Sequence, residues 1–532
     1  MTLGIAAKAL IWIAALILAL LRPTFAAPFF RALETQARRF ARHRLAACLA
    51  LCLLVLVARA ALLPVWRIPR PTIFDEFSYI LGAATFAHGR LTNPTHPLWE
   101  FFDSAYVLQH PTYASKYPPG QALFMAGGQS IFGDPWFGVW LSCGIMAAAL
   151  LWALQGWMPP GWALFGGMLA LPLTIDSYWM NFAAIGGALV LGGYARLIRL
   201  GQVWHALTIG LGIALLANTR PYEGLLFSIP VAIAVLLSRP QWTAFALLAV
   251  ALIPASAATT YYNRAVTGHA LTMPYTEYAR QCAKIPLFNI QPLQPVQVHG
   301  ALPLHDLLEN WEPQQWSRAR SWHLIPDRLN DWKFVATTIL GGIMTLLPLL
   351  LFFPNLWRDR RIRLPIWCIA ATLAGSWIEV CYYQHYFAPA AAALLITSVQ
   401  SFRHLRVWTP GGQVIGLFFS RTIPALVLGA VLLNRGYLIR RPQHVVVNST
   451  RPEVIGLISN LIDRHVILVR YTGPRTPHEE WVYNSAVIDD QEVIWAHDLG
   501  EVENKRLLEY YKDRKIWLFR PDIDPNRLDP YP

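Results

Sequence analysis

The sequence contains few charged residues and few cysteines. Only 14% of its 532 residues are charged, whereas charged residues make up about a quarter of an ordinary soluble domain. This composition excludes an ordinary soluble protein. The six cysteines lie mostly within apolar runs, where a thiol packs as a small hydrophobic group. No disulfide framework is therefore expected.

Motifs that identify a cofactor are also missing. Cys48 and Cys52 are one helical turn apart, but no histidine or acid joins them at the spacing of a metal site. The chain has no Gly-rich phosphate loop, dinucleotide fingerprint or nucleophile elbow. It also has no internal repeat and no low-complexity linker. The pattern therefore gives no support for a soluble nucleotide as substrate or cofactor.

Long apolar runs are what the sequence has in abundance. Hydrophobic residues make up 55% of the chain, and they form about twelve runs near the ~20 residues that a helix needs to cross a bilayer. We therefore predict a polytopic α-helical membrane protein with about 12 transmembrane helices. We interpret the first run as a membrane helix, because it lacks a convincing signal-peptide cleavage site. The runs are 3–21, 45–65, 135–157, 160–175, 181–198, 203–218, 222–238, 241–259, 334–353, 364–382, 387–401 and 411–433.

The arginines predict the orientation in the membrane. Cytoplasmic loops carry an excess of Lys and Arg, and residues 22–44 hold six arginines against one acid, Glu34. Counting spans from there places the other basic short loops on the same side, so the net charge of +13 reflects topology and no nucleic-acid partner is expected. The N-terminus is then external. The predicted parts are an N-terminal helix with a basic cytoplasmic loop (1–44), a transmembrane domain (45–433) with external loops 66–134 and 260–333, and an external domain (434–532).

The last hundred residues have a different pattern. Short apolar runs at 466–469, 493–495 and 516–518 are typical of buried strands, and 453–463 and 501–513 have the apolar spacing of helices. This alternation predicts a small extracytoplasmic α/β domain with a parallel sheet.

The first external loop holds most of the residues suited to chemistry. Asp75 and Glu76 follow the second run closely and should lie near the outer membrane face. A partly desolvated carboxylate there could act as a general base. The pair could equally be the acidic first turn of a helix, which the helix dipole favours. Lys116 follows at the start of the segment Lys-Tyr-Pro-Pro-Gly, 116–120.

The order of these motifs resembles the membrane glycosyltransferases of the GT-C fold, which include the protein O-mannosyltransferases and the lipid A aminoarabinose transferase. The resemblance rests on Asp75-Glu76 and the 116–120 segment and covers roughly residues 45–400. It implies a glycosyltransferase of the bacterial-type inner membrane that uses a polyprenyl-phosphate sugar, with Asp75 as the base and a lipid, glycan or protein as acceptor. The missing nucleotide motifs agree with a lipid-carried donor.

Two short external turns add candidates for substrate binding. Asp176 lies in the turn 174–179 and matches a second external acid of the same superfamily, although Asp is also a favoured helix cap. Arg220 lies in the turn 218–224, where the positive-inside rule makes an arginine unexpected. Its guanidinium suits a lipid phosphate, or it forms a structural ion pair with Glu223.

The segment 379–389 supplies the last candidate. His385 could donate a hydrogen bond to a phosphate or a sugar, while the tyrosines beside it suit either a site or an interfacial aromatic belt. A divalent cation shared by Asp75, Glu76 and Asp176 is possible, but no spacing identifies one.

Two other classes of function fit the composition. A transporter or lipid flippase would use buried charges along a path, but the candidates cluster on one membrane face and no inverted repeat is present. A membrane anchor for a non-catalytic α/β domain would not need so long an acidic external loop. A glycosyltransferase is the favoured hypothesis.

Overall fold

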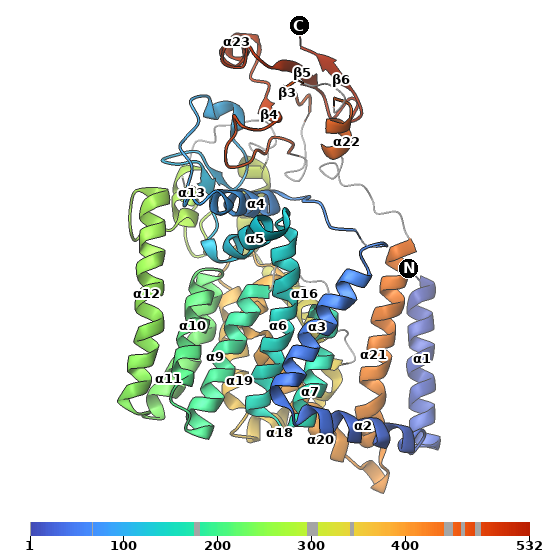
Figure 1. The fold of residues 1–532 in the computed structure, drawn as a ribbon. Helices are drawn as coiled ribbons and strands as arrows, with labels where there is room; N and C mark the ends of the chain where they lie inside the picture. Colours follow the sequence, from blue (N-terminus) through green and yellow to red (C-terminus); the bar gives the residue numbers. More distant parts are fainter. Residues whose placement is uncertain are drawn as a thin grey trace.

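The protein is a helical bundle with a small mixed sheet beyond one end (Figure 1). The structure is a computed structural model. It describes residues 2–65, 67–174, 181–294, 307–340, 345–440, 451–458, 463–473 and 480–531.

The bundle helices follow the apolar runs, and each of the runs contains helix. Four described helices, α3, α6, α9 and α12, are long and apolar enough to cross a membrane on their own, and shorter apolar helices occur at His205–Ala217, Pro221–Leu237 and Ile415–Val427. The number of twelve crossings stays a prediction. The helices are α1 (Thr2–Leu21), α3 (Arg44–Ala61), α6 (Trp136–Trp157), α7 (Pro160–Leu169), α8 (Leu171–Thr174), α9 (Asn181–Leu200), α10 (His205–Ala217), α11 (Pro221–Leu237), α12 (Trp242–Thr267), α16 (Leu324–Leu340), α17 (Leu346–Leu351), α18 (Phe353–Arg358), α19 (Arg363–Ser376), α20 (Ala391–Val407) and α21 (Ile415–Arg440).

Two of the runs are less regular than predicted. The run 334–353 is divided between α16 and α17, and the run 160–175 is divided between α7 and α8. The basic segment 22–44, predicted to be a loop, contains helix α2 (Ala27–Ala41). Its Glu34 accepts hydrogen bonds from Arg406 at 2.7 Å and from Arg421 at 2.8 Å, and these ion pairs join α2 to α20 and α21.

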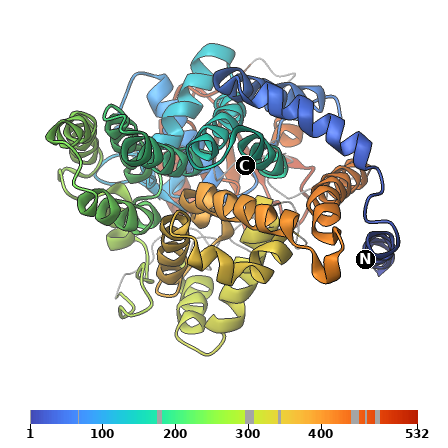
Figure 2. The ribbon, with the colours of Figure 1, turned by 90° about the horizontal axis from the view of Figure 1, so that it is seen from below.

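Small residues allow the helices to approach closely at the centre of the bundle. A Cβ added at Gly212 of α10 would lie 2.7 Å from the carbonyl oxygen of Gly186 in α9. The next glycine, Gly187, packs against Pro389 so tightly that a Cβ would overlap its carbonyl oxygen. Such small-residue contacts are typical of membrane helix packing. Seen along the bundle, α1 lies at the periphery beside α21 (Figure 2).

Short elements cover the end of the bundle nearer the sheet. Helices α4 (Phe74–Ala87) and α5 (Pro119–Phe132) lie across this end (Figure 1). Between them, the strands β1 (Val107–Leu108) and β2 (Ala114–Ser115) pair antiparallel. The remaining elements of this layer are the 3₁₀ helix η1 (Trp99–Phe102), α13 (Pro274–Gln281), the π-helical turn η2 (Leu307–Trp311), α15 (Glu312–Ala319) and the 3₁₀ helix η4 (Gln384–Ala390).

The C-terminal residues form a four-stranded sheet of order β4-β3-β5-β6. The three predicted strands are confirmed as β3 (His465–Val469), β4 (Val493–His497) and β5 (Lys515–Phe519), which run parallel. An unpredicted edge strand, β6 (Leu528–Pro530), pairs antiparallel with β5. Helix α23 (Glu501–Tyr510) confirms the second predicted helix, and α22 (Arg451–Gly456) covers the start of the first.

The sheet packs on the segment 67–134. Leu98, Phe102 and Tyr113 share one apolar cluster with Val466 and Leu468 of the sheet. Polar contacts support this packing, because His497 Nε2 lies 2.7 Å from the Asp103 carbonyl oxygen and His96 Nε2 lies 3.2 Å from Asp489. The segment 66–134 and the sheet must therefore lie on the same side of any membrane that the bundle spans.

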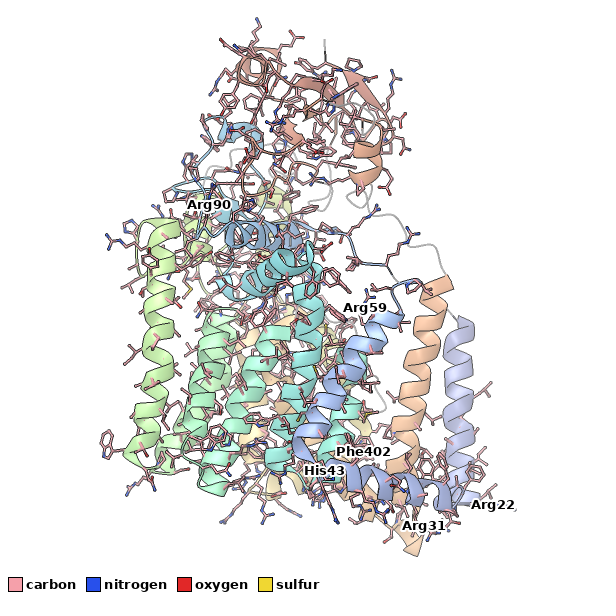
Figure 3. The ribbon with its side chains drawn as sticks, viewed as in Figure 1. Arg22, Arg31, His43, Arg59, Arg90 and Phe402 are labelled. Carbon is pink, nitrogen blue, oxygen red and sulfur yellow. The ribbon has the colours of Figure 1, made fainter. Side chains whose placement is uncertain are left out.

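This packing sharpens the topology prediction. Arg22, Arg31 and His43 lie at the end of the bundle away from the sheet, whereas Arg90 lies at the end near it (Figure 3). The positive-inside rule predicts that the first end faces the cytoplasm. An alkaline phosphatase fused after Pro532 should therefore be active, and a cytoplasm-dependent fluorescent protein at the same position should be dark.

A second pair of fusions within 90–95 checks the same prediction independently. Because the two regions pack together, both positions must give the same answer. Cytoplasmic signals at both positions would show that the protein has the opposite orientation in the membrane. Opposite signals at the two positions would contradict the observed packing.

Candidate active site

Asp75 stands in the first turn of α4, where the helix meets the 106–117 segment. The Tyr117 hydroxyl donates a hydrogen bond to Asp75 Oδ1. The Tyr117 ring stacks on Tyr79 of the same helix, with centroids 4.3 Å apart and planes 16° apart. Asp75 is half-buried. Its carboxylate is therefore held in one orientation while part of its surface stays accessible to a substrate.

Glu76 caps the helix that carries Asp75. Its Oε2 accepts hydrogen bonds from the backbone amide of Thr72 at 2.6 Å, from the Thr72 hydroxyl at 3.3 Å and from the Ile73 amide at 3.3 Å. Both acids thus lie in the first turn of the helix, which the sequence left as the alternative interpretation, and Glu76 in addition caps that turn through the backbone amides before it. Burial raises the pKa of Glu76, and hydrogen bonds from Thr72 and Ile73 oppose that shift. The carboxyl group thus fixes the first turn of α4.

Lys116 lies inside a cage of aromatic rings. Its side chain is 4% exposed. The ammonium nitrogen is 2.8 Å from the centroid of the Tyr106 ring and 4.9, 5.0 and 5.3 Å from those of Tyr275, Tyr278 and Tyr117. Aromatic faces attract a cation. The rings of the 106–117 segment and of α13 therefore hold this ammonium group within electrostatic reach of Asp75.

The electrostatic state of Lys116 reflects burial opposed by two acids. Burial lowers the pKa of Lys116 to about 7, while the charges of Asp75 and Glu312 oppose the shift. Glu312, at the start of α15, is 4% exposed, and its Oε2 has no hydrogen-bond partner among the described residues. Burial raises the pKa of Glu312 to about 7, and the charge of Lys116 opposes this. Both groups can change charge near neutral pH.

The glycine of the Lys-Tyr-Pro-Pro-Gly segment brings Lys116 toward Arg220. Pro119 occupies the first turn of α5, where a missing amide costs nothing. The Gly120 amide donates to the carbonyl oxygen of Asn218 at 2.8 Å. A Cβ on Gly120 would lie 2.6 Å from that oxygen, so only glycine allows this contact. The segment is thereby docked on the turn that ends in Arg220.

Arg220 packs on an aromatic ring at the N-terminus of α11. Its guanidinium carbon lies 4.1 Å from the centroid of the Tyr386 ring. Its Nη1 is 3.9 Å from Glu223 Oε1, which is a loose ion pair. The tyrosines Tyr79 and Tyr117, which contact Asp75 or each other, also lie within electrostatic reach of Arg220. Asp75, Lys116 and Arg220 thus belong to one cluster.

His385 lies in η4 at the edge of this cluster. Its ring is 4.7 Å from that of Tyr386 and is nearly parallel to that of Tyr383, 5.8 Å away. The packing of Gly187 on Pro389 holds η4 against α9. Tyr386 is therefore part of the site through Arg220, in addition to any interfacial role.

A cavity of about 260 Å³ adjoins the cluster. Cys381 and Tyr383 line it, and Cys381 also lies within electrostatic reach of Lys116 and Glu312. Arg328 and Asp331 also line it. This combination of aromatic rings and charged groups provides room and hydrogen-bonding partners for a polar group of a substrate.

Two expectations from the sequence concern a second acid and a metal ion. Asp176 lies outside the described residues. The described part of the chain contains no group of three His, Cys, Asp or Glu side chains that could hold a metal ion. The sequence-based suggestion of a cation shared with Asp176 therefore stays a prediction.

Several residues of the cluster were not predicted. Glu312 and Glu379 are both buried, and Glu379 Oε2 has no hydrogen-bond partner among the residues that the structure describes. Tyr275 and Tyr278 are three residues apart and therefore share a face of α13, which was the only local signal. Nothing in the spacing indicated that this face meets Lys116.

The C-terminal region contacts the helix that carries Asp75 through residues outside its sheet. The Tyr483 ring stacks on Phe77 of α4, with centroids 4.1 Å apart and planes 4° apart. Arg451 donates to the Tyr483 carbonyl oxygen at 2.8 Å. The C-terminal region therefore packs against the helix that carries Asp75 and supports its position.

Comparison with known proteins finds similarity in structure. No protein-family model matches the chain, and no curated protein matches it in sequence. The solved structures that it resembles include ArnT from Cupriavidus metallidurans bound to undecaprenyl phosphate, with a TM-score of 0.47 and 12% identity over 90% of this chain and 93% of that one. The apo structure of the same ArnT gives a TM-score of 0.44 and 14% identity over 88% and 93%. The sequence motifs had suggested the same group of enzymes, and the proposals below rest on this chain's own residues.

Proposed function

We propose that the protein is a GT-C type membrane glycosyltransferase. It transfers a sugar from a polyprenyl phosphate to a hydroxyl group of an acceptor outside the cytoplasm. The observation that carries this proposal is the cluster of Asp75, Lys116 and Arg220 at the external end of the bundle. A base beside two cations is what transfer from a phosphate leaving group requires.

In the proposed reaction, an acceptor oxygen attacks the anomeric carbon of the sugar. The bond between that carbon and the phosphate oxygen breaks, and the acceptor proton passes to the Asp75 carboxylate. The polyprenyl phosphate leaves with the bonding electron pair. Lys116 and Arg220 stabilise the negative charge that develops on it. The N-terminus of α11, where Arg220 lies, contributes the positive end of its helix dipole.

The surrounding residues position these three groups. Glu76 orients Asp75 by capping α4, and Tyr117 fixes the carboxylate through its hydroxyl. His385 and Glu223 flank the Arg220 side, where a phosphate or sugar hydroxyl could contact them. The proposed partners are a polyprenyl-phosphate sugar, membrane lipids, and a lipid, glycan or protein acceptor, and the proposed location is an inner membrane.

The distribution of charge disfavours the transporter alternative. Asp75, Lys116, Arg220 and Glu312 all belong to the cluster at the end of the bundle nearer the sheet. A translocation path would require charged groups at intervals toward the opposite face.

A panel of donors tests the proposal. The purified protein in lipid nanodiscs should release radiolabelled sugar from at least one polyprenyl-phosphate sugar, in the presence of a membrane extract that supplies acceptors. Protein-free nanodiscs serve as the control. Movement of the intact labelled lipid between leaflets, with no sugar released from any donor, would support a flippase and contradict the proposal.

A further inference from the structure

A second polar cavity lies at the opposite end of the bundle. Its volume is about 470 Å³, and Arg199, Arg361 and Arg403 line it. Phe402, the neighbour of Arg403, lies at the end away from the sheet (Figure 3). The cavity is thus formed where α9, the 359–362 turn and α20 meet at that membrane face, and the proposed reaction does not use it.

Two of the three guanidinium groups, those of Arg199 and Arg403, are held by neutral groups. Arg199 Nη2 donates to the Arg361 carbonyl oxygen at 3.0 Å, and its guanidinium carbon lies 4.2 Å from the centroid of a Trp157 ring. Arg403 Nη1 donates to Gln400 Oε1 at 2.8 Å. These contacts orient the arginines without neutralising them.

The single acid that lines the cavity, Asp359, accepts hydrogen bonds from neutral donors. Asp359 Oδ1 accepts from the Arg361 amide at 3.0 Å, and Asp359 Oδ2 accepts from Gln400 Nε2 at 3.0 Å. Within the described part of the chain, no carboxylate forms an ion pair with any of the three arginines. Three positive charges therefore face one negative charge, and the cavity retains a net charge of about +2.

The position and size of the cavity define the ligand. It lies at the ends of membrane helices, and the nearby Trp357 and Trp367 are exposed, as tryptophans at the headgroup level are. Arginine forks match the oxygens of a phosphate, and basic pockets between membrane helices bind anionic headgroups. A volume of this order holds a headgroup.

We propose that this cavity binds the phosphate of an anionic membrane lipid. The lipid headgroup enters between Arg361 and Arg403, and its phosphate supplies the negative charge that balances the arginines. The site is separate from the proposed transfer reaction, so its loss leaves the chemical step intact.

Lipid binding by the full-length protein tests the proposal. In phosphatidylcholine nanodiscs, labelled phosphatidylglycerol should bind the wild type in preference to labelled phosphatidylcholine. The Arg361→Gln/Arg403→Gln variant should bind it about tenfold more weakly, because it loses two charge-assisted contacts. Arg360→Gln, which changes the same basic turn outside the cavity, is the matched control and should bind normally.

A variant that is expected to bind the lipid more tightly shows that weaker binding in the double variant is not caused by misfolding. Asp359→Asn keeps one of the two hydrogen-bond acceptors and removes the negative charge, so it should bind phosphatidylglycerol more tightly than the wild type. Unchanged binding in both this variant and the double variant would overturn the proposal. Binding of inorganic phosphate without any preference for the anionic lipid would also overturn the assignment to a membrane lipid.

Discussion

Asp75→Asn is expected to reduce sugar transfer by about 10²–10⁴-fold, the usual cost of losing a general base. The substitution keeps the shape of the side chain and an oxygen that can accept the hydrogen bond from Tyr117. It removes only the capacity to take a proton from the acceptor. The loss should therefore appear in kcat, with expression, melting temperature and donor affinity close to those of the wild type.

Two further variants separate the base from its surroundings. Asp134→Asn removes an acid that caps α6 through the Trp136 amide at 2.8 Å, and asparagine caps a helix equally well. It should leave transfer unchanged. Tyr117→Phe removes the hydrogen bond to Asp75 and should have a smaller effect than Asp75→Asn. If Asp75→Asn keeps more than about a tenth of the wild-type turnover, Asp75 is not the base.

Sequence patterns located the helices because crossing a bilayer requires long apolar runs. Every run contains helix, but the division of 334–353 into α16 and α17 was not predicted. Hydropathy averages over the run and is insensitive to where its helices begin and end. The parallel strands β3, β4 and β5 were predicted for a similar reason, since buried strands are short and continuously apolar.

The candidate site was only partly predictable. Asp75 and Lys116 were identified because they belong to the two motifs of the first long hydrophilic segment, and Arg220 was identified because the positive-inside rule makes an arginine unexpected in its turn. The cage around Lys116 was not identified, because Tyr106 is separated from Tyr275 and Tyr278 by about 170 residues of sequence. Glu312 was missed for the same reason, since its burial depends on tertiary packing.

The cage leads to a prediction about pH. The pKa of Lys116 is lowered from its ordinary value to about 7 by burial, so the ammonium form prevails below that pH and is lost as the pH rises through it. A sugar phosphodiester donor should therefore bind tightly at pH 6. Its Kd should rise about tenfold per pH unit above the midpoint, because one proton is taken up on binding.

Two substitutions assign this pH dependence to Lys116. Lys116→Arg combined with Glu312→Gln leaves neither group to titrate near pH 7, so donor binding should be independent of pH between 6 and 9, because a guanidinium stays protonated throughout. Glu312→Gln should move the midpoint to lower pH, because the negative charge of Glu312 favours protonated Lys116. Isothermal titration with a non-hydrolysable donor analogue measures each Kd. A flat profile in the wild type would show that Lys116 does not hold the donor phosphate, and Arg220, whose charge is constant over this range, would then be its remaining cationic contact in the cluster.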